Sequence, residues 1–272
     1  RRDLPPLPAP RRERVVVDCA PSLDAIWSHL NPQMLYGKHL GLRGSLARLL
    51  EAGDERALRL QATVEALKSE VAAWMRVRAV WRFFEAEADG DRLLLFEAGA
   101  PEPAHAFSFP RQPKPGGICL ADLVLPPRDG VRDSVAAFVV GAGEGVRERA
   151  TAAKDGGEFL ASHAIQALAL ETAEAAAEWL HARLRALWGF PDAPDMSMKD
   201  RFAARYRGKR YSFGYPACPD HTDQAALWRL LRPEDIGVQL TDGMMMEPEA
   251  SVSALVFHHP EARYFSASGV KR

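Results

Sequence analysis

The chain has 272 residues, of which 47% are hydrophobic and 26% are charged, a composition typical of a globular protein large enough to bury a core. Its 35 basic and 36 acidic residues give a formal net charge of -1, so no global basic field indicates a nucleic-acid partner. No run approaches the roughly 18 apolar residues that a membrane span needs, so we expect a soluble protein without a membrane partner.

The first 14 residues, RRDLPPLPAPRRER, combine proline and arginine without an apolar core behind them. This composition is typical of an exposed linker and not of a signal peptide. We therefore predict a linker over residues 1–14 and one domain over residues 15–272. Because the chain begins with a linker, we expect it to be a piece of a larger protein, although an artificially truncated chain would begin in the same way.

Two helical regions are predicted in the first third of the chain. Residues 21–30 place Ser22 at an N-cap position before apolar side chains at helical spacing, and Pro32 stops this helix. Over residues 45–76 apolar side chains again recur at helical spacing, with a break at Gly53. We expect a helical hairpin there, as an extension of the domain.

A β-hairpin is predicted next. In VRAVWRFFEAEADGDRLLLFE, two β-prone runs flank the dipeptide Asp89-Gly90, which is a strong hairpin signal. This places strands near residues 78–87 and 92–97. The proline-rich stretch that follows allows only a short strand at a sheet edge, for which AHAFSF is the best candidate.

The middle of the chain predicts two central strands and one long helix. GICLADLVL (117–125) and SVAAFVVGAG (134–143) are apolar runs separated by the turn-prone PPRDG. After Gly157 the chain runs to Trp188 without glycine or proline and is rich in Ala, Leu and Glu. This composition indicates a long helix that ends at Gly189.

The last third mixes a short helix, AALWRLL, with strand-like IGVQL, VSALVF and YFSAS. Strands and helices do not alternate in a βαβ rhythm, and no glycine-rich turn follows a first strand, which argues against a Rossmann-type sheet. We predict an α+β fold, with a mainly antiparallel, bent sheet, flanking helices and the helical hairpin near the amino terminus.

Two segments carry a family resemblance. RGKRYSFGYPACPDHTD, residues 207–223, has an Arg followed by a Gly-Tyr-Pro-Ala-x-Pro core, and LTDGMMMEPEASVSALVFHHPEARYFSAS, residues 240–268, follows it in the expected order. GICLADLV, AAFVVGAG and the helix that ends in AEWLHARLRALWG add to the likeness. Over roughly residues 105–268 the chain resembles the activation domain of cobalamin-dependent methionine synthase, a methyltransferase of methionine biosynthesis.

This resemblance implies a module that binds S-adenosylmethionine and supports the reductive methylation of inactive cob(II)alamin to methylcobalamin. It implies a cobalamin-binding module of the same enzyme as partner, and flavodoxin or a reductase as electron donor. The chain has no D-x-H-x-x-G cobalamin motif and no Cys-rich zinc site, so cobalamin is expected on a neighbouring module. Two alternatives stay open: a non-catalytic module that only binds S-adenosylmethionine, and an autonomous small-molecule methyltransferase.

The signature points to Arg210 as the first binding residue. A planar guanidinium can grip the methionine carboxylate of S-adenosylmethionine through two parallel charge-assisted hydrogen bonds. The alternative is a surface arginine in a basic run. Because a ligand-facing arginine supports the site more than the core, we expect Arg210→Leu to leave the stability of the fold unchanged. By resemblance the pocket is also lined by residues of the following turn: Ser212, Gly214, Tyr215, Pro216 and Ala217.

Three more side chains are candidates by resemblance. Tyr264 is expected to cover the adenosine. The family has a Tyr-Tyr or Tyr-Phe pair here, so Phe265 keeps the aromatic surface but has no hydroxyl. For both side chains the alternative is packing in the core. Glu174 lies on a helical stripe and is expected to face the ammonium or sulfonium charge. Its alternative is a solvated carboxylate alongside Glu171 and Glu178.

One family contact has no clear counterpart. The family has an Asp a few residues before a Thr-Pro step that contacts the amino group of the ligand, and the nearest match here is His29-Leu30-Asn31-Pro32. Either His29 or Asn31 substitutes for the Asp, or the correspondence fails at this point.

Cysteine and histidine do not predict a metal site. Cys218 and His221 stand three residues apart, but Cys218 has no second cysteine at metal-ligand spacing. The reaction needs no metal on this chain and no nucleophilic side chain, so we expect no catalytic residue. The three cysteines are few, odd in number and far apart, which favours a reducing cytoplasm over an oxidising compartment.

Overall fold

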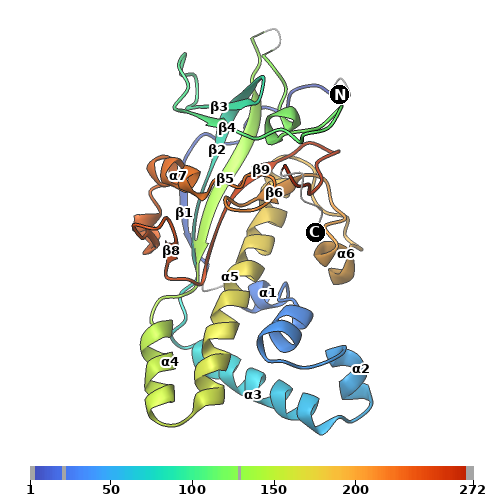
Figure 1. The fold of residues 1–272 in the computed structure, drawn as a ribbon, viewed down its shortest axis with the longest axis vertical. Coiled ribbons are helices and arrows are strands. Elements are labelled where there is room, and N and C mark those ends of the chain that lie inside the picture. Colours follow the sequence, from blue (N-terminus) through green and yellow to red (C-terminus); the bar gives the residue numbers. More distant parts are fainter. Residues whose placement is uncertain (1–3, 20–22, 128–129, 268–272) are drawn as a thin grey trace.

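The computed structural model describes residues 4–19, 23–127 and 130–267. An antiparallel sheet forms the centre of the fold, and a set of helices extends from it at one end (Figure 1). The strands run β4, β3, β2, β5, β9, β6 in spatial order, and β1 also pairs with β2. They comprise β1 Val15–Asp18, β2 Arg78–Asp89, β3 Arg92–Phe96, β4 His105–Ser108, β5 Asp133–Gly141, β6 Lys209–Tyr211 and β9 Ser251–Phe257. The pairings between these strands are antiparallel, which confirms the predicted α+β class.

The predicted helices of the first third are present. The hairpin forms as α2 Leu46–Glu51 and α3 Glu55–Val71. Gly53, at φ +71°, allows the break between them, and the Asp54 side chain accepts a hydrogen bond from the Ala57 N–H at 2.8 Å, which caps α3. The preceding short helix is α1 Leu23–Trp27, while its proposed cap Ser22 lies outside the described residues. A π-helical segment, η2 Gln33–His39, follows it.

The predicted hairpin of β2 and β3 is confirmed with its turn one residue later. Asp89 pairs with Arg92, so the two turn residues are Gly90, at φ +61°, and Asp91. β4 lies at the sheet edge, as the prolines around it predicted.

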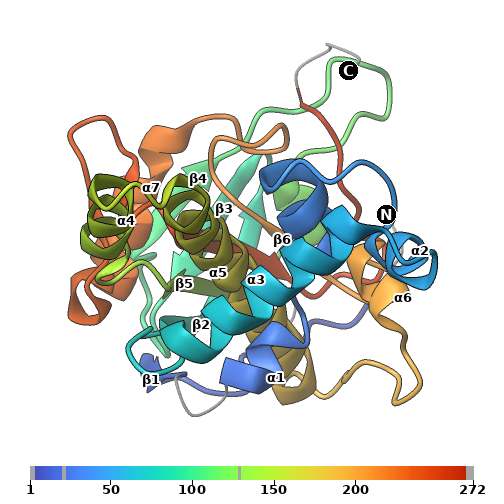
Figure 2. The ribbon, with the colours of Figure 1, turned by 90° about the horizontal axis from the view of Figure 1, so that it is seen from below.

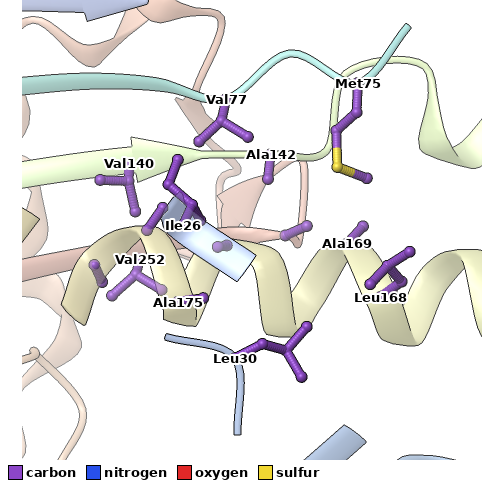
Figure 3. Close-up of a cluster of buried hydrophobic side chains, with 14 of the residues drawn as sticks. Ile26, Leu30, Met75, Val77, Val140, Ala142, Leu168, Ala169, Ala175 and Val252 are labelled. Carbon is purple, nitrogen blue, oxygen red and sulfur yellow. The ribbon is translucent and has the colours of Figure 1, made fainter. Parts of the chain in front are cut away.

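Strand β5 is buried on both faces, as its continuous apolar run predicted. Its side chains alternate between two cores, with Phe138 on the helical side and Val139 on the other. The helical-side core joins β5 and β9 to α1, α3 and the long helix (Figures 2 and 3), and Figure 3 labels Ile26, Leu30, Met75, Val77, Val140, Ala142, Leu168, Ala169, Ala175 and Val252 within it. The second core packs against α7 Gln224–Leu231 and two 3-10 helices, η3 Leu120–Leu123 and η5 Pro233–Ile236.

The long helix is confirmed as α5 Phe159–Leu187. It runs from the helical end of the molecule to the sheet (Figure 1), and its buried alanines allow close packing on β5 and β9. Helix α4 Val146–Asp155 was not predicted from the sequence; it packs beside α5. Because α4 buries few side chains, its apolar periodicity is weak. The short elements α6 Met198–Phe202, η4 His221–Asp223 and the ribbon of β7 Gln239–Leu240 with β8 Met246–Glu247 complete the described chain.

The prediction of a strand over GICLADLVL is wrong. Its centre forms η3, because Asp122 Oδ2 accepts a hydrogen bond from the Cys119 N–H at 3.0 Å and closes a capping box. Arg111 holds the same carboxylate through two guanidinium nitrogens. The apolar residues of the run are buried by this turn and not by strand pairing.

Two strand predictions near the carboxyl terminus also need correction. The described part of YFSAS, residues 264–267, is irregular: the Ala267 N–H bonds the carbonyl of Pro216, in the turn after β6, and does not continue a strand ladder. IGVQL is mostly not a strand: Ile236 ends η5, and only Gln239 and Leu240 pair. VSALVF is confirmed as part of β9.

Residues 4–14 lie along the domain. Leu7 and Ala9 pack against the helical-side core, and Arg14 forms an ion pair with Asp235 at 2.6 Å. The boundary between linker and domain stays a prediction. Within the described residues, no helix combines the length and the apolar character that crossing a membrane requires.

Candidate functional site

Two adjoining cavities lie where α5, β6, β9 and the segment after β9 meet. The polar cavity, of about 650 Å³, is lined by charged and polar side chains that include His29, His39, Glu171, Glu178, Arg201 and Tyr206. The aromatic cavity, of about 710 Å³, is lined by Tyr211, Ser212, Pro216, Ala217, Phe265 and Ser266. Both are lined by Glu174, Arg210, Tyr215, Val252 and Tyr264. Each volume falls within the roughly 300–1,000 Å³ of small-molecule sites.

Arg210 stands at the junction of the two cavities. Strand β6 pairs it with Val256 of β9, and alternation along β6 buries its neighbours Lys209 and Tyr211. The Arg210 guanidinium donates from Nη1 to Glu178 Oε2 at 2.7 Å and from Nη2 to Glu174 Oε2 at 3.3 Å. The alternative of a freely solvated surface arginine is wrong, since the Arg210 side chain is only 17% exposed.

Electrostatics keep Arg210 permanently charged. Burial lowers the pKa of Arg210, but the negative charges of Glu178 and Glu174 outweigh that effect, so the pKa is raised above its ordinary value. The guanidinium is therefore a fixed cation between the cavities, as recognition of an anion requires.

The carboxylates of α5 differ in their surroundings. The alternative from the sequence was that all three carboxylates are solvated. Glu174 is half exposed, which agrees with it, but Glu171 and Glu178 are buried, so the alternative is wrong for these two. Glu171 accepts from His39 Nε2 at 3.0 Å, and burial raises the pKa of this carboxyl. Buried carboxylates need such partners.

The turn after β6 is closed by its own hydrogen bonds. The Gly214 N–H donates to the Cys218 carbonyl at 2.9 Å, the Cys218 N–H returns a bond to Tyr215, and the Cys218 thiol donates to the Ser212 carbonyl. Gly214 has φ +83°, a conformation that favours glycine. It shapes the turn but is not one of the lining residues of either cavity, unlike Ser212 and Tyr215.

Aromatic side chains form the wall beyond Arg210. Tyr264 and Tyr215 are 57% and 63% exposed, so neither is a core aromatic. Phe265 is half-buried and packs against the other core, and the Tyr211 ring contacts both Tyr264 and Phe265. Exposed rings beside a cavity provide an apolar surface on which a planar base can stack. The structure thus brings Tyr215, Tyr264 and Phe265 together with Arg210.

His29 and Asn31 line the polar cavity. His29 Nδ1 lies 2.9 Å from the Ala25 carbonyl, and Arg201 Nη1 donates to His29 Nε2 at 2.9 Å. This arrangement assigns the ring proton to Nδ1 and engages both nitrogens. Asn31 Oδ1 accepts from the Gln33 N–H. Whether either residue replaces the family's Asp stays a prediction.

The groups behind Arg210 were not predicted from the sequence. The Tyr206 hydroxyl donates to Glu178 Oε2 at 3.1 Å, and Arg185 stacks on the Tyr206 ring with its guanidinium carbon 3.8 Å from the centroid. Glu178 follows Glu174 by four residues, so helical spacing alone places both on the same face of α5.

The described residues contain no group of three or more side chains arranged to hold a metal ion. Cys218 and a further buried histidine, His258, have other partners. Cys218 bonds the Ser212 carbonyl, and buried His258 contacts Asp133 Oδ1 at 2.6 Å.

Comparison with known proteins gives concordant results. The family model described as the activation domain of vitamin B12-dependent methionine synthase matches residues 35–272. A methionine synthase of Mycobacterium tuberculosis (strain ATCC 25618 / H37Rv) is 33% identical over 205 residues, which cover 69% of this chain. The match covers only 17% of that enzyme, so the chain corresponds to a small part of its length.

A solved structure matches nearly the whole chain. The crystal structure of the MetH reactivation domain bound to AdoHcy, or S-adenosylhomocysteine, superposes with a TM-score of 0.90 at 29% sequence identity. The match covers 98% of this chain and 85% of that one. Its fold is therefore the same mainly antiparallel sheet with helices.

Proposed function

Because the chain belongs to the vitamin B12-dependent methionine synthase activation domain family, we propose that it binds S-adenosylmethionine across the polar and aromatic cavities. The observation that carries this proposal is the position of Arg210, a fixed cation at the junction of a carboxylate-lined cavity and an aromatic one. A matching domain is known with S-adenosylhomocysteine bound, which supports the assignment.

The groups around the junction fit the ligand. Its methionine carboxylate matches the Arg210 guanidinium, and its ammonium and sulfonium charges match Glu174, which is half exposed and lines both cavities. Its adenosine matches the rings of Tyr264, Tyr215 and Phe265. Ser212, Pro216 and Ala217 line the wall, and Gly214 holds the turn that carries them.

We further propose that this binding serves the reductive methylation of cobalamin carried by a neighbouring module. That module would supply the methyl acceptor, a cobalt reduced by an electron from a flavodoxin or a reductase. The methyl group would pass from sulfur to that cobalt: the reduced cobalt would give the electron pair of the new bond, the pair of the broken C–S bond would stay on sulfur, and S-adenosylhomocysteine would remain. The chain itself binds and orients the methyl donor, so it needs no nucleophile or general base.

The test is a reconstitution of methyl transfer. The chain is mixed with a cobalamin-bearing fragment of a methionine synthase, S-adenosylmethionine labelled in its methyl group, and a chemical reductant. The proposal predicts labelled methylcobalamin only when chain, reductant and fragment are all present. A module that only binds S-adenosylmethionine would give binding without transfer, and an autonomous methyltransferase would release labelled small-molecule product without the cobalamin fragment.

A further inference from the structure

Behind Arg210, charged side chains alternate in sign from the interior to the cavities. Asp192 accepts two hydrogen bonds from Arg185, at 2.6 and 2.7 Å. Arg185 Nη2 lies 3.8 Å from Glu178 Oε1, and Glu178 Oε2 accepts from Arg210 Nη1 at 2.7 Å. A ligand carboxylate at Arg210 would continue this alternation as its fifth member.

Burial fixes the inner part of this chain of charges. The side chains of Arg185, Asp192 and Glu178 are 1%, 7% and 11% exposed. A buried carboxylate that loses its cation costs free energy, so Glu178 stays with Arg210. The Tyr206 hydroxyl, which donates to the same oxygen, restrains it further.

Glu174 contacts the same guanidinium differently. Its side chain is 50% exposed, and its oxygen lies 3.3 Å from Arg210 Nη2. An exposed ion pair is screened by water and contributes little. Glu174 can therefore leave the guanidinium at low cost, whereas Glu178 cannot.

We propose that Glu178 is a positioning residue that holds the Arg210 guanidinium in place for a ligand carboxylate, and that Glu174 is the exchangeable partner that the carboxylate displaces from Nη2. The inference rests on the proposed function, since it assumes S-adenosylmethionine as the ligand. Tyr206 and Arg185 act through Glu178, Tyr206 by the hydrogen bond of its hydroxyl and Arg185 by its charge.

The test compares two ligands on one variant, Glu178→Gln, which removes the charge and keeps the shape. By calorimetry or competition, affinity for S-adenosylmethionine is expected to fall about tenfold, as for a weakened charge-assisted contact. Affinity for 5′-methylthioadenosine, which has neither carboxylate nor ammonium, is expected to change less than about twofold. A merely structural role would lower both affinities equally and would overturn the inference.

Tyr206→Phe provides a second variant in case Glu178→Gln folds poorly. It removes the hydroxyl donor to Glu178 and retains the ring on which Arg185 stacks, so a smaller loss for S-adenosylmethionine alone is expected. Glu55→Gln, at an exposed ion pair on α3, serves as the matched control and should change neither affinity. If both site variants bind S-adenosylmethionine like the parent, the inference is wrong and the proposed function stands. If the parent chain does not bind S-adenosylmethionine, the proposed function fails and the inference fails with it.

Discussion

A Cβ atom on Gly208 would lie 2.6 Å from the carbonyl oxygen of Phe257. The glycine has φ +75°, in the left-handed region that other residues rarely adopt. The next residue, Lys209, pairs with Phe257 and begins β6. Gly208 thus lets β6 approach β9 and so sets the position of Arg210 two residues later.

Gly208→Ala is therefore expected to lower the free energy of unfolding by about 1–3 kcal/mol, because it adds backbone strain and a contact with the Phe257 carbonyl. Urea denaturation measures the change. The control is Gly90→Ala, which has a similar φ of +61° with no atom within 4 Å of the added Cβ. Equal losses at both glycines would show that the close approach at Gly208 contributes nothing.

Arg210→Leu is expected to weaken S-adenosylmethionine binding by about 1.5–3 kcal/mol, the range for losing a charged hydrogen-bond partner, which is roughly tenfold to a hundredfold. Arg210→Lys should restore part of the loss, because it keeps the charge without the planar fork. Calorimetry measures both variants. Unchanged affinity of Arg210→Leu would disprove the carboxylate contact.

Arg210→Leu is also expected to lower the stability of the chain without ligand, by about 1–3 kcal/mol. This corrects the expectation from sequence that the fold would be unaffected, because the variant leaves buried Glu178 without its 2.7 Å partner. Thermal and urea unfolding without ligand provide the measurement. A parent-like stability would mean that Tyr206 and Arg185 alone satisfy Glu178.

Glu174→Gln should behave in the opposite way, with weaker ligand binding and little change in stability. Its ion pair with Arg210 is half exposed, so its loss is expected to change the free energy of unfolding by less than about 1 kcal/mol. Loss of the carboxylate that faces the ligand's positive charges should reduce affinity several-fold, and less so at high salt. An affinity that rises in the variant would show that Glu174 only competes with the ligand for Arg210.

We expect the buried side chain of His181 to make the free energy of unfolding depend on pH. Burial lowers the pKa of His181 well below its ordinary value, and the charges of Arg185, Arg210 and Lys209 act in the same direction. Below a pH of about 6.5 the unfolded chain binds a proton that the folded chain does not. The free energy of unfolding should therefore fall by about 1.4 kcal/mol per pH unit for this residue.

The stabilisation that neutral His181 contributes is fully present above the pKa of this histidine in the unfolded chain. It is lost as the pH falls toward the pKa of His181 in the folded chain. Urea denaturation of the parent and of His181→Phe between pH 7 and pH 5 isolates it. Burial also lowers the pKa of His105 and of His259, so the variant should keep a shallower slope. Identical slopes would contradict a neutral, buried His181.

The elements with a strong local signal were predictable from the sequence. Apolar residues recur at helical spacing in α3, helix-forming residues run through α5 without glycine or proline, and β-prone apolar runs form β2, β5 and β9. The failures have local causes that composition does not show. The apolar run at residues 117–125 folds as a turn because of one contact, from Asp122 to the Cys119 N–H.

The candidate site was only partly predictable. The family resemblance identified Arg210, the turn after it and Glu174 as site residues, and the structure showed that Glu174 contacts Arg210. Tyr206 comes from an irregular segment, and Asp192 follows the end of α5, so no spacing rule links them to Glu178. Burial of Glu171 and Glu178 was also not predictable, because glutamates on a helix are usually solvated.

If this chain binds S-adenosylmethionine and leaves cobalamin to another module, calorimetric titration of the chain with each compound separately will distinguish the two ligands. We expect about one equivalent of S-adenosylmethionine bound, with affinity reduced in Arg210→Leu, and no tight binding of cobalamin. Tight binding of cobalamin without binding of S-adenosylmethionine would contradict it.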